Sequence, residues 1–119
     1  MRIKCVKTSI DDPKNNITNS NLKEYLLIGT LFWVYGITFF QGVTYVYIFN
    51  GEHLFEVPLE MFSVIDDKVP DNWRIKIKDY GAVTLWPELF YESMFLENFA
   101  EREPKEREIF KELMAEIER

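Results

Sequence analysis

The feature of this sequence that most limits its fold is a stretch of 27 uncharged residues between Glu24 and Glu52. A run of that length could cross a bilayer as one helix, because about 20 apolar residues are enough. Its composition argues against a helix, since the apolar residues are largely aromatic or β-branched and four glycines interrupt them. The Asn50-Gly51 pair near its end predicts a hairpin with a type I′ turn, which requires positive φ at both residues. We therefore expect buried strands here.

Short aromatic or alternating segments, separated by turn residues, predict strands through most of the chain. The expected strands cover residues 2–7, 31–40, 43–49, 53–57, 63–65, 73–78 and 82–86, with one helical turn at 58–62 and a polar loop at 8–23. Gly36 should mark a bulge or a sharp bend in its strand, and Gln41-Gly42 should turn the chain. Such closely spaced short strands predict a small barrel or a strongly bent sheet.

Two strands have informative alternation. In residues 2–7, Ile3 and Cys5 share one face, so Cys5 is expected to be a small core residue rather than a reactive thiol. In residues 73–78, Trp73 and two isoleucines point one way and three basic residues point the other. That pattern is typical of a half-exposed antiparallel strand.

The composition changes after Trp86. Residues 87–119 contain ten acidic and five basic residues, whereas residues 1–86 contain ten and nine. Pro87 and Pro104 each suit the first turn of a helix. In the second helix an apolar stripe, expected to pack on the strands, is formed by Ile109, Phe110, Leu113, Met114 and Ile117. We predict one domain over residues 1–119, mostly β within an α+β class, with a β-barrel at 1–86 and an acidic helical segment at 87–119.

The net charge of −6 restricts the possible partners. Nucleic acids and anionic lipids both require a basic surface, so we expect neither as a partner, and no membrane attachment. An acidic protein is steered electrostatically toward a basic partner. The single cysteine, Cys5, allows no internal disulfide, which suits a reducing compartment and makes the cytoplasm the expected location.

Few residues could carry chemistry. His53 is the only histidine, so any catalytic triad would have to use it, and zinc lacks enough nitrogen or sulfur ligands. The carboxylate pairs Asp66-Asp67 and Glu88 with Glu92 are more simply read as solvated surface groups. A magnesium site made only of carboxylates stays open, although no spacing favours it. We expect no enzyme, no cofactor and no metal. An aromatic cage for a proline-rich peptide or a methylated lysine also stays open, formed by Trp33, Tyr45, Tyr47, Trp73 and Trp86.

Three stretches together resemble a set of small bacterial proteins with an SH3-like barrel, among them immunity proteins of polymorphic and contact-dependent growth-inhibition toxin systems. The stretches are residues 22–29 with 35–37, residues 57–66 with 69–73, and residues 83–88. The resemblance spans roughly residues 22–100. It implies a small, strongly bent, SH3-like antiparallel barrel with a C-terminal helix packed on it.

The same resemblance, with the acidic charge, implies an immunity protein that binds and occludes the C-terminal domain of a cognate toxin, expected to be a nuclease. The alternative is a non-toxin SH3-like module that binds a protein or a peptide. No small-molecule substrate is expected. Acidic side chains would meet the toxin's basic substrate groove around a few aromatic anchors. The predicted partner-binding residues are Asp66, Asp67, Asp71, Glu88 and Glu92, with Tyr91 as the anchor.

Overall fold

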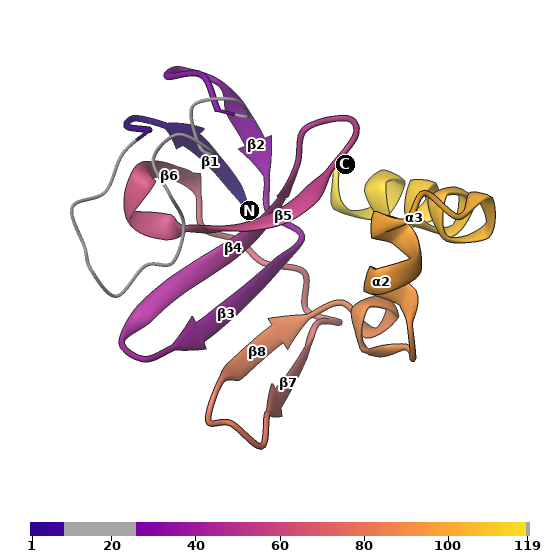
Figure 1. Ribbon diagram of the computed structural model, residues 1–119. Coiled ribbons are helices and arrows are strands. Elements are labelled where there is room, and N and C mark those ends of the chain that lie inside the picture. The colour runs from indigo at the N-terminus through magenta and orange to yellow at the C-terminus, as the bar shows by residue number, and fades with distance from the viewer. Residues whose placement is uncertain (9–25, 119) are drawn as a thin grey trace.

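The computed structural model describes residues 1–8 and 26–118, and its strands form two antiparallel sheets (Figure 1). The smaller sheet has the order β2-β1-β6, from Leu31–Trp33, Arg2–Cys5 and Phe62–Asp66. The larger sheet has the order β5-β4-β3-β8-β7, from Leu54–Pro58, Val43–Phe49, Gly36–Phe40, Val83–Trp86 and Arg74–Ile77. The helical elements are η1 (Leu59–Met61), η2 (Glu88–Tyr91), α2 (Phe95–Ala100) and α3 (Pro104–Ile117). The predicted polar loop at 8–23 lies almost wholly outside the described residues.

The mixed α+β class with a C-terminal helix is confirmed, whereas closure of the strands into one barrel is not found. The expected strand at 31–40 is divided between the two sheets. Residues 31–33 pair with β1, and the chain then crosses at Val34 and Tyr35 so that β3 begins at Gly36 in the larger sheet. The predicted bend near Gly36 is therefore the place where the chain passes from one sheet to the other.

Gly36 also permits a close approach between β3 and the indole of Trp86. A Cβ at this position would lie 2.8 Å from Cδ1 of Trp86 and 3.3 Å from Cδ2 of Tyr47. The indole is held in place because its Nε1 donates a hydrogen bond to Oγ1 of Thr38 at 3.1 Å. Any side chain at position 36 would displace this buried ring.

Of the two predicted turns next to β4, Gln41-Gly42 turns the chain as expected, and the Asn50-Gly51 turn differs from its predicted geometry. The Asn50-Gly51 hairpin is present, but the predicted type I′ turn is wrong, because Phe49 pairs with Leu54 across a four-residue loop. Asn50 instead uses its side-chain oxygen to accept hydrogen bonds from the N–H groups of Glu52 and His53, at 3.0 and 2.7 Å. The pair of positive φ angles occurs at Gln41 and Gly42, at 50° and 79°.

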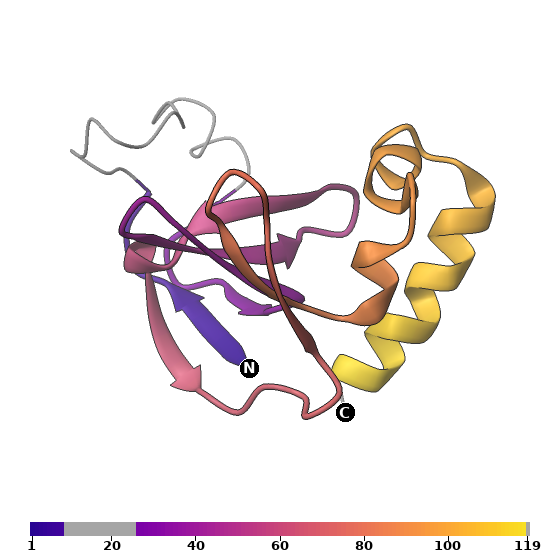
Figure 2. The ribbon, with the colours of Figure 1, turned by 90° about the horizontal axis from the view of Figure 1, so that it is seen from below.

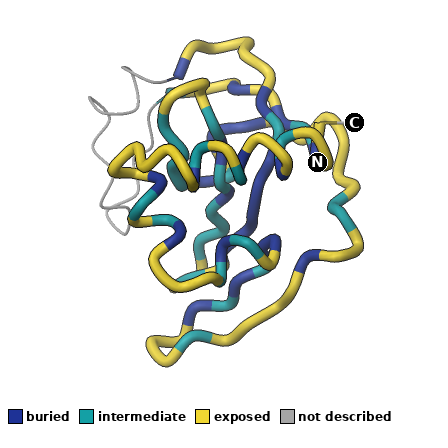
Figure 3. The backbone as a smooth tube through the Cα atoms, turned by 90° about the vertical axis from the view of Figure 1, so that its right-hand side faces the viewer, coloured by how far each residue is buried: buried dark blue, intermediate teal, exposed yellow. Residues whose placement is uncertain are grey.

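Helices α2 and α3 close the end of the β structure where β4 turns into β5 and β8 ends (Figures 1 and 2). Phe110 of α3 lies at the centre of an aromatic cluster, with ring centroids 5.3 Å from Tyr35, 5.0 Å from Phe49 and 4.7 Å from Phe99. Arg107 adds a polar link, donating to the carbonyl oxygens of Glu52 and Phe99 at 2.7 and 2.8 Å. The predicted apolar stripe therefore packs on the domain, and the outward turns of α3 are exposed (Figure 3).

Strand β7 is exposed at all four of its residues, and its lysine side of the sheet, not its isoleucine side, lies against aromatic rings. Ile75 and Ile77 are 69% and 78% exposed, so the expectation of a half-exposed strand is wrong. The ammonium group of Lys76 lies 4.4 Å from the ring centroid of Tyr91, and that of Lys78 lies 5.2 Å from that of Trp86. Cation–π contacts and the apolar lysine stems therefore cover this face.

None of the helices in the described parts of the chain is long and apolar enough to cross a membrane.

Candidate protein-binding groove

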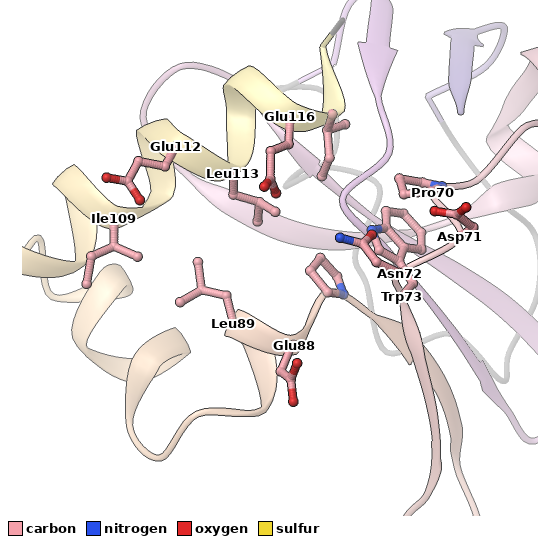
Figure 4. A pocket seen from close by; sticks show the side chains of 12 residues that line it. Pro70, Asp71, Asn72, Trp73, Glu88, Leu89, Ile109, Glu112, Leu113 and Glu116 are labelled. Carbon is pink, nitrogen blue, oxygen red and sulfur yellow. The ribbon is translucent and has the colours of Figure 1, made fainter.

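A groove of about 510 Å³ runs between α3 and the β structure (Figure 4). Helix α3 forms one side, and the other side comes from two segments that flank strands, residues 70–73 before β7 and residues 87–89 after β8. These segments lie together because β7 and β8 are neighbours, with Arg74 paired to Trp86. The start of one strand and the end of the next therefore meet at the same edge of the sheet.

The groove combines an apolar floor with an acidic rim. Its rim carboxylates are all exposed and belong to Asp71, Glu88, Glu112 and Glu116. Its apolar lining is formed by Pro70, Trp73, Pro87, Leu89, Ile109, Leu113 and Ile117. Among the described residues, these carboxylates form an ion pair with one basic residue, Arg74, whose guanidinium lies 3.8 Å from the Glu88 carboxylate in an exposed pair. Such a pair stabilises the fold little and yields easily to a competing cation.

The structure brings two of the six predicted binding residues into this groove, Asp71 and Glu88. Asp66 and Asp67 lie at the end of β6 and beyond it, where the Asp66 carboxylate accepts a hydrogen bond from the N–H of Lys68 at 3.0 Å. Glu92 is exposed just after η2 and does not line the groove.

Tyr91, the predicted anchor, packs against the β7–β8 pair instead. Its hydroxyl donates to the carbonyl oxygen of Arg74 at 2.8 Å and lies 2.7 Å from Oγ1 of Thr84. Its ring stacks on Trp86 at 5.0 Å. These contacts tie η2 to the sheet, and Tyr91 does not line the groove.

Sequence reasoning missed Glu112 and Glu116, which supply half of the acidic rim. The signal was present, because these residues are four apart on the helix and flank the apolar stripe at Leu113. Residues at that spacing lie on one face of a helix, one turn apart. What the sequence did not show is that residues 70–73 and 87–89 lie opposite them.

The groups considered for chemistry lie apart from one another. In the described parts of the chain, no group of three or more histidine, cysteine, aspartate or glutamate side chains is placed to hold a metal ion. Cys5 is buried, which raises the pKa of its thiol and keeps it protonated. His53 lies beside Glu52, with Nε2 3.9 Å from the carboxylate.

The five residues proposed for an aromatic cage are dispersed. Trp33 lies under the Arg2 guanidinium at 4.7 Å, and Trp73 lies in the groove. Tyr47 and Trp86 contact each other at 5.7 Å within the aromatic core. The cage as predicted is therefore not assembled.

The carboxylate of Glu56 in β5 is partly withdrawn from water. Burial raises its pKa, and hydrogen bonding from the Thr38 and Tyr47 side chains offsets part of that rise. The folded protein thus holds this proton more tightly than the unfolded chain, so stability should fall as the pH rises from the ordinary glutamate range through the raised pKa. Replacing Glu56 with glutamine should remove this loss.

We therefore expect Glu56→Gln to match the wild type in thermal stability below about pH 4, near the ordinary glutamate pKa, and to exceed it at pH 7. Thermal unfolding of both proteins from pH 3 to pH 8 measures the difference. Burial raises the pKa of Tyr47, which lies beside this carboxylate, so its hydroxyl stays neutral over that range. If the melting temperatures of the two proteins differ by the same amount at every pH, Glu56 is not desolvated.

Comparisons of this chain with protein-family models, with curated protein sequences and with solved structures found no match. The function is therefore inferred from the groove and the sequence patterns alone.

Proposed function

We propose that this chain is a non-enzymatic binding protein that takes a basic segment of a protein partner into the acid-rimmed groove. The observation that carries the proposal is the placement of four exposed carboxylates around one apolar floor. A lysine or arginine side chain matches both the floor and the rim of this groove. Its apolar stem can pack on the floor while its charged end meets the carboxylates of the rim. Acidic rims also accelerate association with basic partners.

The acidic charge on α3 supports a binding role because it works against the helix. Glu112 and Glu116 form a like-charged pair one turn apart, and the last turn of α3 contains no basic residue. The C-terminal end of a helix carries a partial negative charge, so carboxylates there destabilise it. Glu112 and Glu116 are therefore placed where they reduce stability, which a role in binding would explain.

Replacing Glu116 with lysine should raise the stability of the fold while weakening partner binding. The substitution converts a repulsive pair with Glu112 into an attractive one and complements the helix dipole, for a gain of about 0.5–1 kcal/mol. Thermal or urea unfolding of the variant measures this gain. A loss of stability would show that Glu116 has a structural role.

The specific form of the proposal is an immunity protein with an SH3-like arrangement of strands. It would act in the cytoplasm and bind the C-terminal domain of a cognate toxin, a nuclease whose basic substrate groove the acidic rim would cover. Asp71 and Glu88, together with Glu112 and Glu116, would make the central contacts, and no catalytic residue, cofactor or metal takes part. This part of the proposal draws on the resemblance of the three sequence stretches and on the negative charge.

The test is protection of a bacterial host from the C-terminal domain of a secreted toxin encoded beside the gene. We expect co-expression of this chain to restore growth, and the two purified proteins to form a stable complex. A neighbouring toxin domain that kills cells regardless of this chain, and that does not bind it, would contradict the immunity proposal. Binding to a neighbouring protein without toxicity would favour the alternative, a non-toxin SH3-like binding module.

A further inference from the structure

A second hollow, separate from the groove, lies between the end of the β3–β4 hairpin and the β7–β8 turn. Its volume is about 230 Å³, and it is lined by Thr38, Phe40, Tyr45, Glu56, Tyr80 and Ala82. A single water needs roughly 10–15 Å³ of such volume, so the hollow has room for a small organic group. The lining comes from β3, β4 and β5 and from the segment between β7 and β8, and it combines aromatic rings with one carboxylate.

The carboxylate of Glu56 has no positively charged partner among the ion pairs of residues 1–8 and 26–118. It belongs to β5, where Glu56 pairs across the sheet with Tyr47. Thr38 and Tyr47 supply hydrogen bonds to it, but neither carries a charge. A carboxylate that is partly removed from water and lacks a counter-charge attracts a cation strongly.

Three aromatic residues line the hollow, namely Phe40, Tyr45 and Tyr80. Tyr80 is 66% exposed, yet its ring is held edge to face against Phe40 with centroids 5.5 Å apart. Tyr45 of β4 lines the same hollow. The faces of such rings attract cations within about 6 Å, most strongly when water is excluded.

The protein already uses ammonium groups on the same side of this sheet. Lys76 and Lys78 place theirs over Tyr91 and Trp86, at 4.4 and 5.2 Å from the ring centroids. Cross-strand pairing places Lys76, Thr84 and Thr38 on one face, and Thr38 lines the hollow. The hollow also combines aromatic rings, here with a carboxylate, and the described residues that line it include no lysine.

We propose that this hollow is a binding site for an alkylammonium group, with Glu56 as the counter-charge and Phe40, Tyr45 and Tyr80 as the surrounding rings. The group can be carried by a small free amine or by the end of a lysine side chain, since both present the same chemistry. The site does not depend on the groove or on the identity of the partner that binds there.

The test is an NMR titration of the full chain with four probes. n-Butylammonium represents a free amine, and N-acetyl-lysine methylamide represents a lysine side chain. Choline and 3,3-dimethylbutan-1-ol have the same shape but differ in charge. We expect the cations to perturb the resonances of residues 38–40, 45, 56 and 80–82, and choline to bind at least tenfold more tightly than the neutral alcohol.

Four variants complete the experiment. Glu56→Gln preserves the size of the side chain and keeps one oxygen that accepts hydrogen bonds, and we expect it to weaken cation binding at least tenfold. Tyr80→Ala should weaken binding about threefold, whereas Tyr80→Phe should retain it because the ring remains. Glu60→Gln removes the same charge at an exposed position outside the hollow and should have no effect.

Two results would overturn the proposal. The first is equal affinity for choline and the neutral alcohol, and the second is unchanged binding by a folded Glu56→Gln variant. If only n-butylammonium binds, the ligand is a free amine. Binding by the lysine derivative as well extends the site to protein side chains.

Discussion

A variant in which Asp71, Glu88, Glu112 and Glu116 are all replaced by lysine is expected to associate with the partner about 10- to 1000-fold more slowly at low ionic strength. The four carboxylates surround one groove, so their potentials add over a basic partner and accelerate its approach. Salt screens this attraction. The wild-type rate should therefore fall steeply with ionic strength, whereas the rate of the variant should not fall. Stopped-flow association with the partner domain at several salt concentrations measures both effects.

The control for this variant changes four exposed acidic residues that do not line the groove, namely Glu60, Asp79, Glu97 and Glu101. Replacing them with lysine gives the same net charge as the groove variant. We expect it to lose much less of the association rate, because its new charges lie away from the contact. Equal losses in the two variants would mean that the total charge, and not the groove, attracts the partner.

Replacing Gly36 with valine is expected to destabilise the fold by about 3 kcal/mol or more, the upper range for an overpacked core. The first side-chain atom alone would lie 2.8 Å from Trp86, and that ring is fixed by its hydrogen bond to Thr38 and by edge-to-face contacts with Tyr47 and Phe90. A loss of this size lowers the melting temperature by about 10 °C in a domain of this length. Thermal unfolding followed by circular dichroism measures the shift.

A second pair of variants shows whether the indole is the cause. Gly36→Ala should destabilise the fold less than Gly36→Val does. The loss of stability should be smaller still in a Trp86→Leu background, where the clashing ring is absent. Equal costs of Gly36→Ala in both backgrounds would place the strain elsewhere. A valine variant as stable as the wild type would show that Trp86 can move.

Local patterns in the sequence predicted the elements but not their assembly. The alternation around Ile3 and Cys5 and the proline at position 104 depend on neighbouring residues, and the structure confirms both the first strand and the start of α3. The division of residues 31–40 between two sheets could not be read in this way. It depends on which distant strands are available to pair. Residues 31–33 pair with β1, whereas residues 37–39 pair with β8.

The turns and β7 show how tertiary contacts override a local preference. Asn50-Gly51 predicts a two-residue turn, but Asn50 satisfies two backbone N–H groups from a wider loop. In β7 the isoleucines are the apolar side chains, so they were expected to be the buried ones. They are exposed instead, and the lysine ammonium groups contact the rings of Tyr91 and Trp86, which lie on the other side of the sheet.

The binding surface could be predicted only in part, for a similar reason. Asp71 and Glu88 were proposed because acidic loop residues after strands suit a basic partner, and the structure places both at the groove. Their neighbours across the groove, Glu112 and Glu116, belong to a helix whose docking position no local pattern specifies. The hollow around Glu56 had one sequence signal, a lone carboxylate inside an otherwise apolar strand.

Hydrogen–deuterium exchange of the chain, alone and in complex with its partner, tests most directly whether the groove is the binding surface. We predict that the partner slows exchange in residues 70–73, 87–89 and 109–117, and leaves β6 and the exposed edge strand β7 unchanged. Slowed exchange confined to β6 or β7, with the three groove segments unaffected, would contradict the account.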